Sequence, residues 1–260
     1  MSAAGRSGLD LQLRTLKLPS FVQYHEEIAA RADREGLCFN ECLRHLVELE
    51  LSDREVRKID RLRKRSGLPP EKTLANLDQK RLPQKVRRQL PALCEGGFVE
   101  RAENVLAFGM PGRGKTHTLS AIAHELVGRG ISVLWRPAYH LVQRLLVAKR
   151  ELALEAELRR LDRFEVVVLD DIGYVQQDRE EMEVLFTFLA ERYERRSVMI
   201  TSNLVFSQWD KIFKDAMTTA AAIDRLVHHS IILELTGESF RTDAAKKRNR
   251  AVSKVGSEKA

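Results

Sequence analysis

The feature that most constrains the fold of this chain is the stretch GMPGRGKT at residues 109–116. It fits the pattern G-x-x-x-x-G-K-[ST], and it stands between a short apolar run at residues 105–108 and an apolar-periodic run that predicts a helix beginning at Lys115. The glycines allow a tight turn whose backbone N–H groups point toward a phosphate, and the positive end of the helix dipole adds to that field. The stretch therefore predicts a nucleoside triphosphate site on a strand–loop–helix unit.

The residues of this loop are candidate nucleotide ligands. Lys115 is expected to reach the β- and γ-phosphates, and Thr116 is expected to place its hydroxyl on Mg²⁺. The alternative, a glycine-rich turn without a ligand, does not account for a strand, a loop, a lysine and a helix in this order. The candidate set is Gly109, Pro111, Gly112, Arg113, Gly114, Lys115, Thr116 and His117.

A second motif consists of four apolar residues at 166–169 that end in Asp170 and Asp171, as in a Walker B strand. Such a strand carries its acids to the carboxyl end, where open α/β sheets place ligands. Asp170 is expected to hold Mg²⁺, directly or through water, and Asp171 to orient and activate the attacking water. Many ring-forming ATPases have glutamate, one methylene longer, at this second position. The alternative is a strand followed by an acidic turn.

Two further residues are candidates for contacts with the γ-phosphate. Asn203 follows the next predicted strand and is expected to report the presence of the phosphate, whereas the alternative is an Asn that helps a turn. Arg225 lies on a predicted helix before the last strand and is expected to act as an arginine finger toward a neighbouring subunit. The alternative is an intramolecular pair with Asp224, and Arg195 and Arg196 are weaker candidates for the finger.

Turn signals and hydrophobic periodicity divide the chain into four parts. We expect a small helical domain at residues 1–65, a linker and basic connector at 66–101, alternating strands and helices at 102–241, and a basic, disordered tail at 242–260. Within the first part, residues 1–15 are expected to be a loose start, with helices opening near residues 19, 40 and 52. The predicted fold class is therefore α/β: a P-loop parallel sheet with flanking helices, preceded by a small all-helical domain.

Composition limits the class of protein and its partners. The formal net charge is +7, and basic residues gather at 54–65, at 80–88 and after Phe240. Such clusters suit a polyanion such as nucleic acid, although they equally suit solvated helix faces and a solubilising tail. No apolar run approaches the length of a membrane span, and the first residues lack the apolar core of a signal peptide. We therefore expect a cytoplasmic protein with no membrane partner.

The three cysteines do not form a closed disulfide set. Cys38, Cys42 and His45 fall on one face of a possible helix, at a spacing that suits a metal ion. No fourth ligand stands nearby in an obvious pattern, so we expect small apolar core positions instead.

The order of four segments, GMPGRGKTH, VVVLDDIGY, ERYERRSVMITSN and DRLVHHSIILELTGESFR, resembles the IstB family, the ATP-binding helpers of insertion-sequence transposases. The likeness covers about residues 12–242. It implies a AAA+ ATPase akin to bacterial helicase loaders, with ATP and Mg²⁺ as cofactors. It also implies a homo-oligomer on double-stranded DNA, in which Arg225 faces a neighbouring subunit, and a cognate transposase as partner.

Three functions compete at this point. The leading one is an ATP-dependent DNA-binding assembly factor that oligomerises on DNA and regulates or recruits a transposase. A replicative helicase loader would share the motor but bind a helicase through its N-terminal region. A small-molecule P-loop kinase would be a monomer with a substrate lid, and it would leave the Asp224–Arg225 element without a purpose.

Overall fold

The computed structural model describes residues 3–174, 179–204 and 226–236. The chain divides into two compact units, Met1–Arg61 and Leu62–Ala260. The predicted boundaries at residues 65, 101 and 241 stay predictions. None of the described helices is long and apolar enough to cross a membrane.

The first unit is helical, and its helices differ from the predicted ones in two places. Helix α1, Ala3–Thr15, occupies the segment that we predicted to be loose. The prediction was wrong because residues 9–15 contain good helix formers and no glycine or proline, so the helix forms although Gly5 and Gly8 lie in its first half. Helix α2, Pro19–Glu35, begins where expected and ends at Gly36, which adopts the left-handed conformation of a helix C-cap.

Helix α3, Phe39–Ser66, is continuous where we predicted two helices. Asp53 does not cap a new helix, because its carboxylate instead accepts a hydrogen bond from Ser20 Oγ on α2 at 2.8 Å. One turn earlier, Glu50 accepts a hydrogen bond from the backbone N–H of Ser20 at 2.9 Å and pairs with Arg54 at 2.7 Å. These contacts attach the start of α2 to the middle of α3, so the polar residues at 50–54 join two helices.

A five-stranded, fully parallel sheet forms the centre of the second unit, in the order β2-β3-β4-β1-β5. This architecture confirms the predicted α/β class. Since all strands run the same way, the residues that follow β1, β3 and β4 lie at one edge of the sheet. The strands are β1 Asn104–Phe108, β2 Val133–Pro137, β3 Val166–Asp170, β4 Ser197–Ser202 and β5 Ser230–Glu234.

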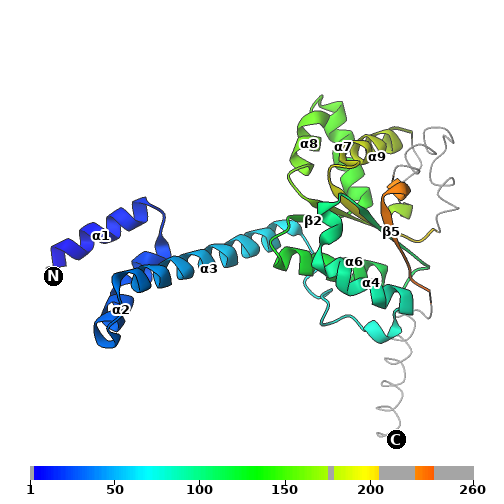
Figure 1. Cartoon of the computed structure of the whole chain (residues 1–260). Helices are drawn as coiled ribbons and strands as arrows, with labels where there is room; N and C mark the ends of the chain where they lie inside the picture. Colours follow the sequence, from blue (N-terminus) through cyan, green and yellow to red (C-terminus); the bar gives the residue numbers. More distant parts are fainter. Residues whose placement is uncertain (1–2, 175–178, 205–225, 237–260) are drawn as a thin grey trace, which may run out of the picture. The chain divides into compact units, whose positions relative to one another are not determined.

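Helices cover both faces of this sheet (Figure 1). On one face lie α4, Gln84–Glu95, and α6, Lys115–Gly128; on the other lie α7, Ala138–Arg150, and α9, Arg179–Arg192. Helix α8, Leu154–Leu161, follows α7 after a break at Leu152, whose φ is 56°. The shorter elements are α5 Gly97–Glu100, η1 Gln79–Arg81 and η2 Ile172–Tyr174.

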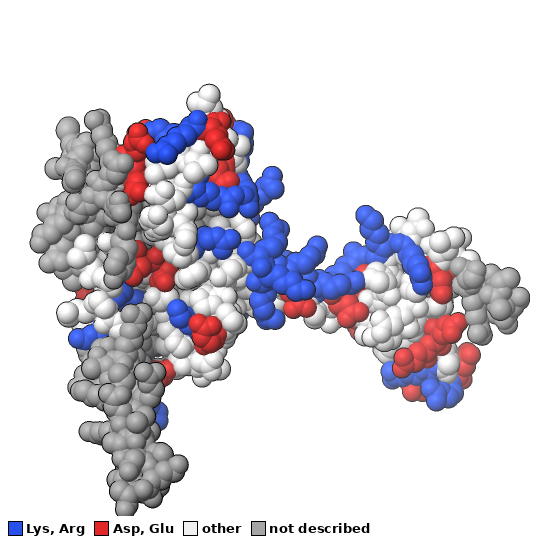
Figure 2. Space-filling model, turned by 180° about the vertical axis from the view of Figure 1, so that it is seen from behind, with Lys and Arg blue, Asp and Glu red and all other residues white. Residues whose placement is uncertain are grey.

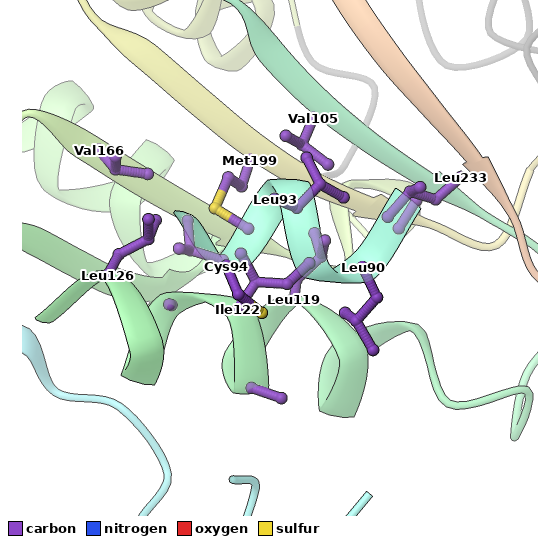
Figure 3. Close-up of a cluster of buried hydrophobic side chains, with 14 of the residues drawn as sticks. Leu90, Leu93, Cys94, Val105, Leu119, Ile122, Leu126, Val166, Met199 and Leu233 are labelled. Carbon is purple, nitrogen blue, oxygen red and sulfur yellow. The ribbon is translucent and has the colours of Figure 1, made fainter. Parts of the chain in front are cut away.

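The segment predicted as a connector contributes to the core of the second unit. Leu90 and Leu93 of α4 meet Leu119 of α6 beneath Met199 and Leu233 of the sheet (Figure 3). Their burial removes apolar surface from water, at about 1.5–3 kcal/mol for each large side chain. Residues 77–98 are therefore part of the wall against which the phosphate-loop helix α6 packs.

The cysteines lie in three different environments. Cys38, just before α3, is exposed and Cys42 is half-buried, so the expectation of core positions was wrong for both. Cys94, on α4, is the buried cysteine. Within the described ranges, no group of three or more His, Cys, Asp or Glu side chains is placed to hold a metal ion.

Candidate nucleotide-binding site

Three strand ends bring the predicted site residues together. The glycine-rich loop follows β1, Asp170 ends β3, and Asn203 comes directly after β4. Strand β4 pairs with both β1 and β3, with Phe108 opposite Ser202 and Leu169 opposite Ile200. The parallel register therefore places a loop, an acidic pair and an amide at one edge of the sheet.

Backbone conformation explains two glycines of the loop. Gly109 has φ 149°, and a Cβ at this position would collide with the carbonyl oxygen of Leu235. Gly114, at φ 87°, is the residue that precedes α6. Both conformations strain any residue with a side chain. The chain can therefore turn from β1 into α6 within a few residues, and the first N–H groups of α6 face the loop.

Lys115 is buried at the start of α6, with 6% of its surface exposed. Its ammonium donates hydrogen bonds to the carbonyl oxygens of Gly109 at 2.6 Å and Met110 at 3.1 Å, and to Asn203 Oδ1 at 2.6 Å. A buried charge is tolerated only where such acceptors compensate for lost water. The loop therefore curls around the ammonium group and holds a positive charge at its centre.

Asp170 is held by hydroxyl groups from two directions. Thr116 Oγ1 donates to Asp170 Oδ1 at 2.8 Å, and Thr201 Oγ1 donates to the same oxygen at 2.7 Å. A carboxylate beside a hydroxyl is the oxygen-rich arrangement that Mg²⁺ prefers. Thr116 and Asp170 are thus adjacent, as the metal assignment from the sequence requires.

Asp171 has an unusual backbone for a residue that is not glycine, with φ 63°. Its N–H donates to Thr201 Oγ1 at 2.7 Å, and its Oδ1 accepts a hydrogen bond from Asn203 Nδ2 at 2.8 Å. A left-handed conformation costs about 1–3 kcal/mol and persists where surrounding contacts determine it, which is common at functional sites. Asn203 therefore contacts both Lys115 and the second carboxylate.

A cavity of about 210 Å³ opens over these residues. Most of the predicted nucleotide residues line it, together with three that the sequence reasoning did not assign: Lys72, Leu77 and Thr201. Thr201 ends a predicted strand and could have been suspected, but Lys72 and Leu77 lie far from the loop in sequence. The predicted residues in the lining are Pro111, Gly112, Gly114, Lys115, Thr116, His117, Asp171 and Asn203.

Three predicted residues of the described part, Gly109, Arg113 and Asp170, are not part of the cavity lining. Gly109 and Arg113 belong to the loop, and Asp170 is hydrogen-bonded to Thr116, which lines the cavity. His117 lines the cavity, and its Nε2 lies 3.1 Å from the carbonyl oxygen of Thr73, so this ring also attaches the segment before α4 to α6. Arg225, with Asp224, lies outside the described residues. Of the two weaker finger candidates, Arg195 and Arg196, the first pairs with Asp162 at 2.8 Å.

The donor set of the cavity fits a nucleotide with a divalent cation. The loop presents N–H groups and a buried ammonium to phosphate oxygens. Thr116 and Asp170 supply a hydroxyl and a carboxylate for a hard cation. Lys72, Leu77 and His117 form the side of the cavity that comes from outside the loop.

The sequence matches a family model and named relatives. A family model described as IstB-like ATP binding protein matches residues 11–250. A Sinorhizobium fredii protein named as an insertion sequence ATP-binding protein is 41% identical over 238 residues, which are 91% of this chain and 80% of that protein. A Pseudomonas aeruginosa protein named for insertion sequence IS21 is 37% identical over 242 residues, 92% of this chain and 90% of the other.

Solved structures share the fold at low sequence identity. The crystal structure of DnaI aligns with a TM-score of 0.55 and 22% identity, over 66% of this chain and 96% of that one. DnaA from Aquifex aeolicus, bound to AMPPCP, aligns with a TM-score of 0.54 and 18% identity, over 72% of this chain and 57% of that chain. These matches confirm the predicted AAA+ fold.

Proposed function

Because the chain belongs to the IstB-like ATP-binding protein family, the ATP-binding helpers of insertion-sequence transposition, we propose that it is a Mg²⁺-dependent ATPase that assembles on double-stranded DNA and recruits or regulates a partner transposase. Family membership confirms the resemblance found in the sequence. Membership in this family also argues against the alternative function of a small-molecule P-loop kinase. Likeness to DnaI concerns the fold alone, and no contact of the described residues favours a helicase loader over a transposition helper.

The observation that carries the ATPase proposal is the hydrogen-bonded series from Lys115 through Asn203 to Asp171. It joins the group that would hold the phosphates to the group that would take a proton from water. ATP with Mg²⁺, when bound, supplies the phosphoryl group and part of the charge that stabilises its transfer. Thr116 and Asp170 would hold the metal, and Asp171 would orient the attacking water and accept its proton.

Asn203 gives the site a means to report its nucleotide state. The Lys115 ammonium now binds loop carbonyl oxygens, and phosphate oxygens would compete with them for its N–H groups. Any movement of the ammonium changes its contact with Asn203, and thereby the position of Asp171. The amide would therefore couple phosphate binding to the placement of the catalytic carboxylate.

The proposals of DNA binding and oligomerisation rest on charge and on the finger residue. A net charge of +7 favours a polyanion. An arginine supplied by a neighbouring subunit would complete the charge around the transferred phosphoryl group, so hydrolysis would depend on assembly. Arg225 is our candidate for this arginine.

The proposed function is tested by measuring the oligomeric state of the full chain by sedimentation velocity, with ATP, ADP or no nucleotide, and with or without duplex DNA. We expect large assemblies only when ATP and DNA are both present. A monomer under every condition would refute the assembly role. Adding a cognate transposase, or instead the replicative helicase of the same cell, separates the two partner classes, since only the transposase should co-sediment.

A further inference from the structure

A second cavity, of about 200 Å³, lies beside the edge strand β2 in the second unit. It shares no lining residue with the nucleotide cavity. Five arginines converge on it: Arg65 at the end of α3, Arg136 on β2, Arg144 on α7, Arg160 on α8, and Arg163 after α8. We call these residues the arginine pocket. Figure 2 shows Lys and Arg gathered where α3 ends and on the neighbouring surface of the second unit.

The charge of the arginine pocket is strongly one-sided. Five arginines and a single acid, Glu157, line it, a formal excess of four positive charges. Glu157 pairs with Arg144 at 2.6 Å and with Arg160 at 3.6 Å. Among the described residues, no acidic side chain pairs with the other three arginines. Like charges this close repel one another, so an anion that entered the cavity would be attracted by all five.

Two of the arginines are held in place by neutral groups. Arg136 Nη1 donates a hydrogen bond to the carbonyl oxygen of Trp135 at 2.7 Å. The guanidinium carbon of Arg65 lies 5.6 Å from the ring centroid of Phe164, which itself lines the cavity. Neither contact neutralises the charge. The pocket is thus partly organised before any anion binds, which lowers the entropic cost of binding.

The type of cation indicates the type of anion. All five basic residues of the lining are arginines, and none is lysine. A planar guanidinium binds two oxygens of one phosphate in parallel, whereas an ammonium acts as a point charge. Convergence of several guanidinium groups on a small cavity therefore suits a phosphate group rather than a diffuse negative surface.

We propose that the arginine pocket binds a backbone phosphate of DNA and fixes the second unit on the duplex. The proposal rests on the proposed function, because it names where one part of the DNA is held. Among the described residues, the basic stretch at 80–88 contributes nothing to the lining, and Arg65 alone comes from the stretch at 54–65. The site is created by the fold, which brings five separated arginines to one edge strand.

The test measures binding of a short fluorescent duplex of random sequence by anisotropy, as a function of salt concentration. Arg163→Gln and Arg136→Gln each remove one charge of the pocket, and Arg159→Gln is the matched control, since it lies on α8, pairs with Glu155 and does not line the pocket. Each pocket variant should weaken binding and flatten the log–log salt slope, by about 0.9 for a lost phosphate contact. The control should behave as the wild type does.

A change of opposite sign strengthens the test. Glu157→Gln removes the single acid of the lining and should tighten DNA binding, provided that its melting temperature shows an intact fold. Binding of a fluorescent ATP analogue should be unchanged in all four variants, because the two cavities share no residue.

Three outcomes would overturn the proposal. If the wild type binds DNA and both pocket variants keep its affinity and salt slope, the pocket assignment fails while the proposed function stands. If the pocket variants keep DNA binding but lose the transposase, the occupant is an acidic protein surface and not DNA. If the wild type binds no DNA at any salt concentration, the proposed function fails as well.

Discussion

Asn203 Oδ1 accepts a hydrogen bond from Lys115 Nζ at 2.6 Å, although the two residues are 88 positions apart in the chain. The same side-chain amide donates to Asp171 Oδ1 at 2.8 Å. One orientation of the amide satisfies both contacts, because a lysine can only donate and an ionised carboxylate can only accept. The phosphate-loop lysine and the proposed catalytic base Asp171 are therefore linked through one polar side chain.

Lys115 and Asp171 are expected to have separate roles, nucleotide binding for Lys115 and hydrolysis for Asp171. Lys115→Ala should abolish nucleotide binding, because it removes the buried ammonium of the loop. Asp171→Asn should keep binding and lose hydrolysis, since an amide does not accept the proton of water. Equilibrium binding of a fluorescent ATP analogue and phosphate release in single turnover measure the two steps. Tight ATP binding by the Lys115 variant would contradict the role of the loop.

Replacing Asn203 should slow hydrolysis more than it weakens binding. In Asn203→Ala, Lys115 and Asp171 both lose a partner that positions them, and the loss of one preorganised polar contact costs about 10²–10³-fold in rate at comparable sites. The neighbouring Ser202→Ala is the control, because the Ser202 hydroxyl hydrogen-bonds to the backbone N–H and carbonyl oxygen of Leu204. Steady-state ATPase assays give kcat and KM separately. An equal decrease of kcat in the Asn203 and Ser202 variants would indicate a general disturbance of β4.

Thr201 is expected to position both acids. Thr201→Val keeps the shape of this buried side chain but removes the hydroxyl that accepts from the Asp171 N–H and donates to Asp170. An unsatisfied buried group costs about 1–3 kcal/mol. We therefore expect slower hydrolysis and a higher Mg²⁺ concentration for half-maximal rate. Thr201→Ser should restore most of the activity, and a Val variant with a normal Mg²⁺ titration would rule out the positioning role.

Arg225 is predicted to act on the nucleotide of a neighbouring subunit. Arg225→Ala should bind ATP nearly normally and hydrolyse it at least about 10³-fold more slowly, the typical effect of an arginine finger. Mixing this variant with Lys115→Ala should restore part of the activity, because each supplies what the other lacks at a shared interface. If the mixed assembly forms and stays inactive, Arg225 has no role in trans.

Cys94 reports on the packing of α4 against the second unit. Burial, aided by the negative charge of Glu125, raises the pKa of the Cys94 thiol to about 11. At pH 8 only about one in a thousand Cys94 side chains is then in the reactive thiolate form. Cys94 should therefore resist alkylation by iodoacetamide in the native protein. Exposed Cys38 should react readily, and Cys94 should react once guanidinium unfolds the chain. Mass spectrometry of peptides reads the labelling, and fast native labelling of Cys94 would mean that α4 detaches.

The main elements of the site could be predicted because their signals are local. One signal is a glycine-rich turn before a helix, and the other is an apolar run that ends in two aspartates. Each is a pattern of neighbouring residues that indicates its function without the rest of the chain. Their shared edge follows from the parallel sheet, because the carboxyl ends of its strands meet there. Helix boundaries were harder to predict. The pair Ser52-Asp53 is typical of a helix N-cap, but the Asp53 carboxylate instead binds Ser20 on a neighbouring helix, a contact that only the tertiary structure reveals.

The amino-acid order by itself thus determined the phosphate loop, the acidic strand and the α/β class, because each depends on neighbours in the chain. Tertiary structure alone decided that residues 77–98 support α6, and that Lys72 and Leu77 border the nucleotide cavity. It likewise decided that Thr201 joins two aspartates and that five scattered arginines surround one cavity. The physical reason is that burial and hydrogen bonding act between groups close in space, and only the completed sheet with its helices brings these distant residues together.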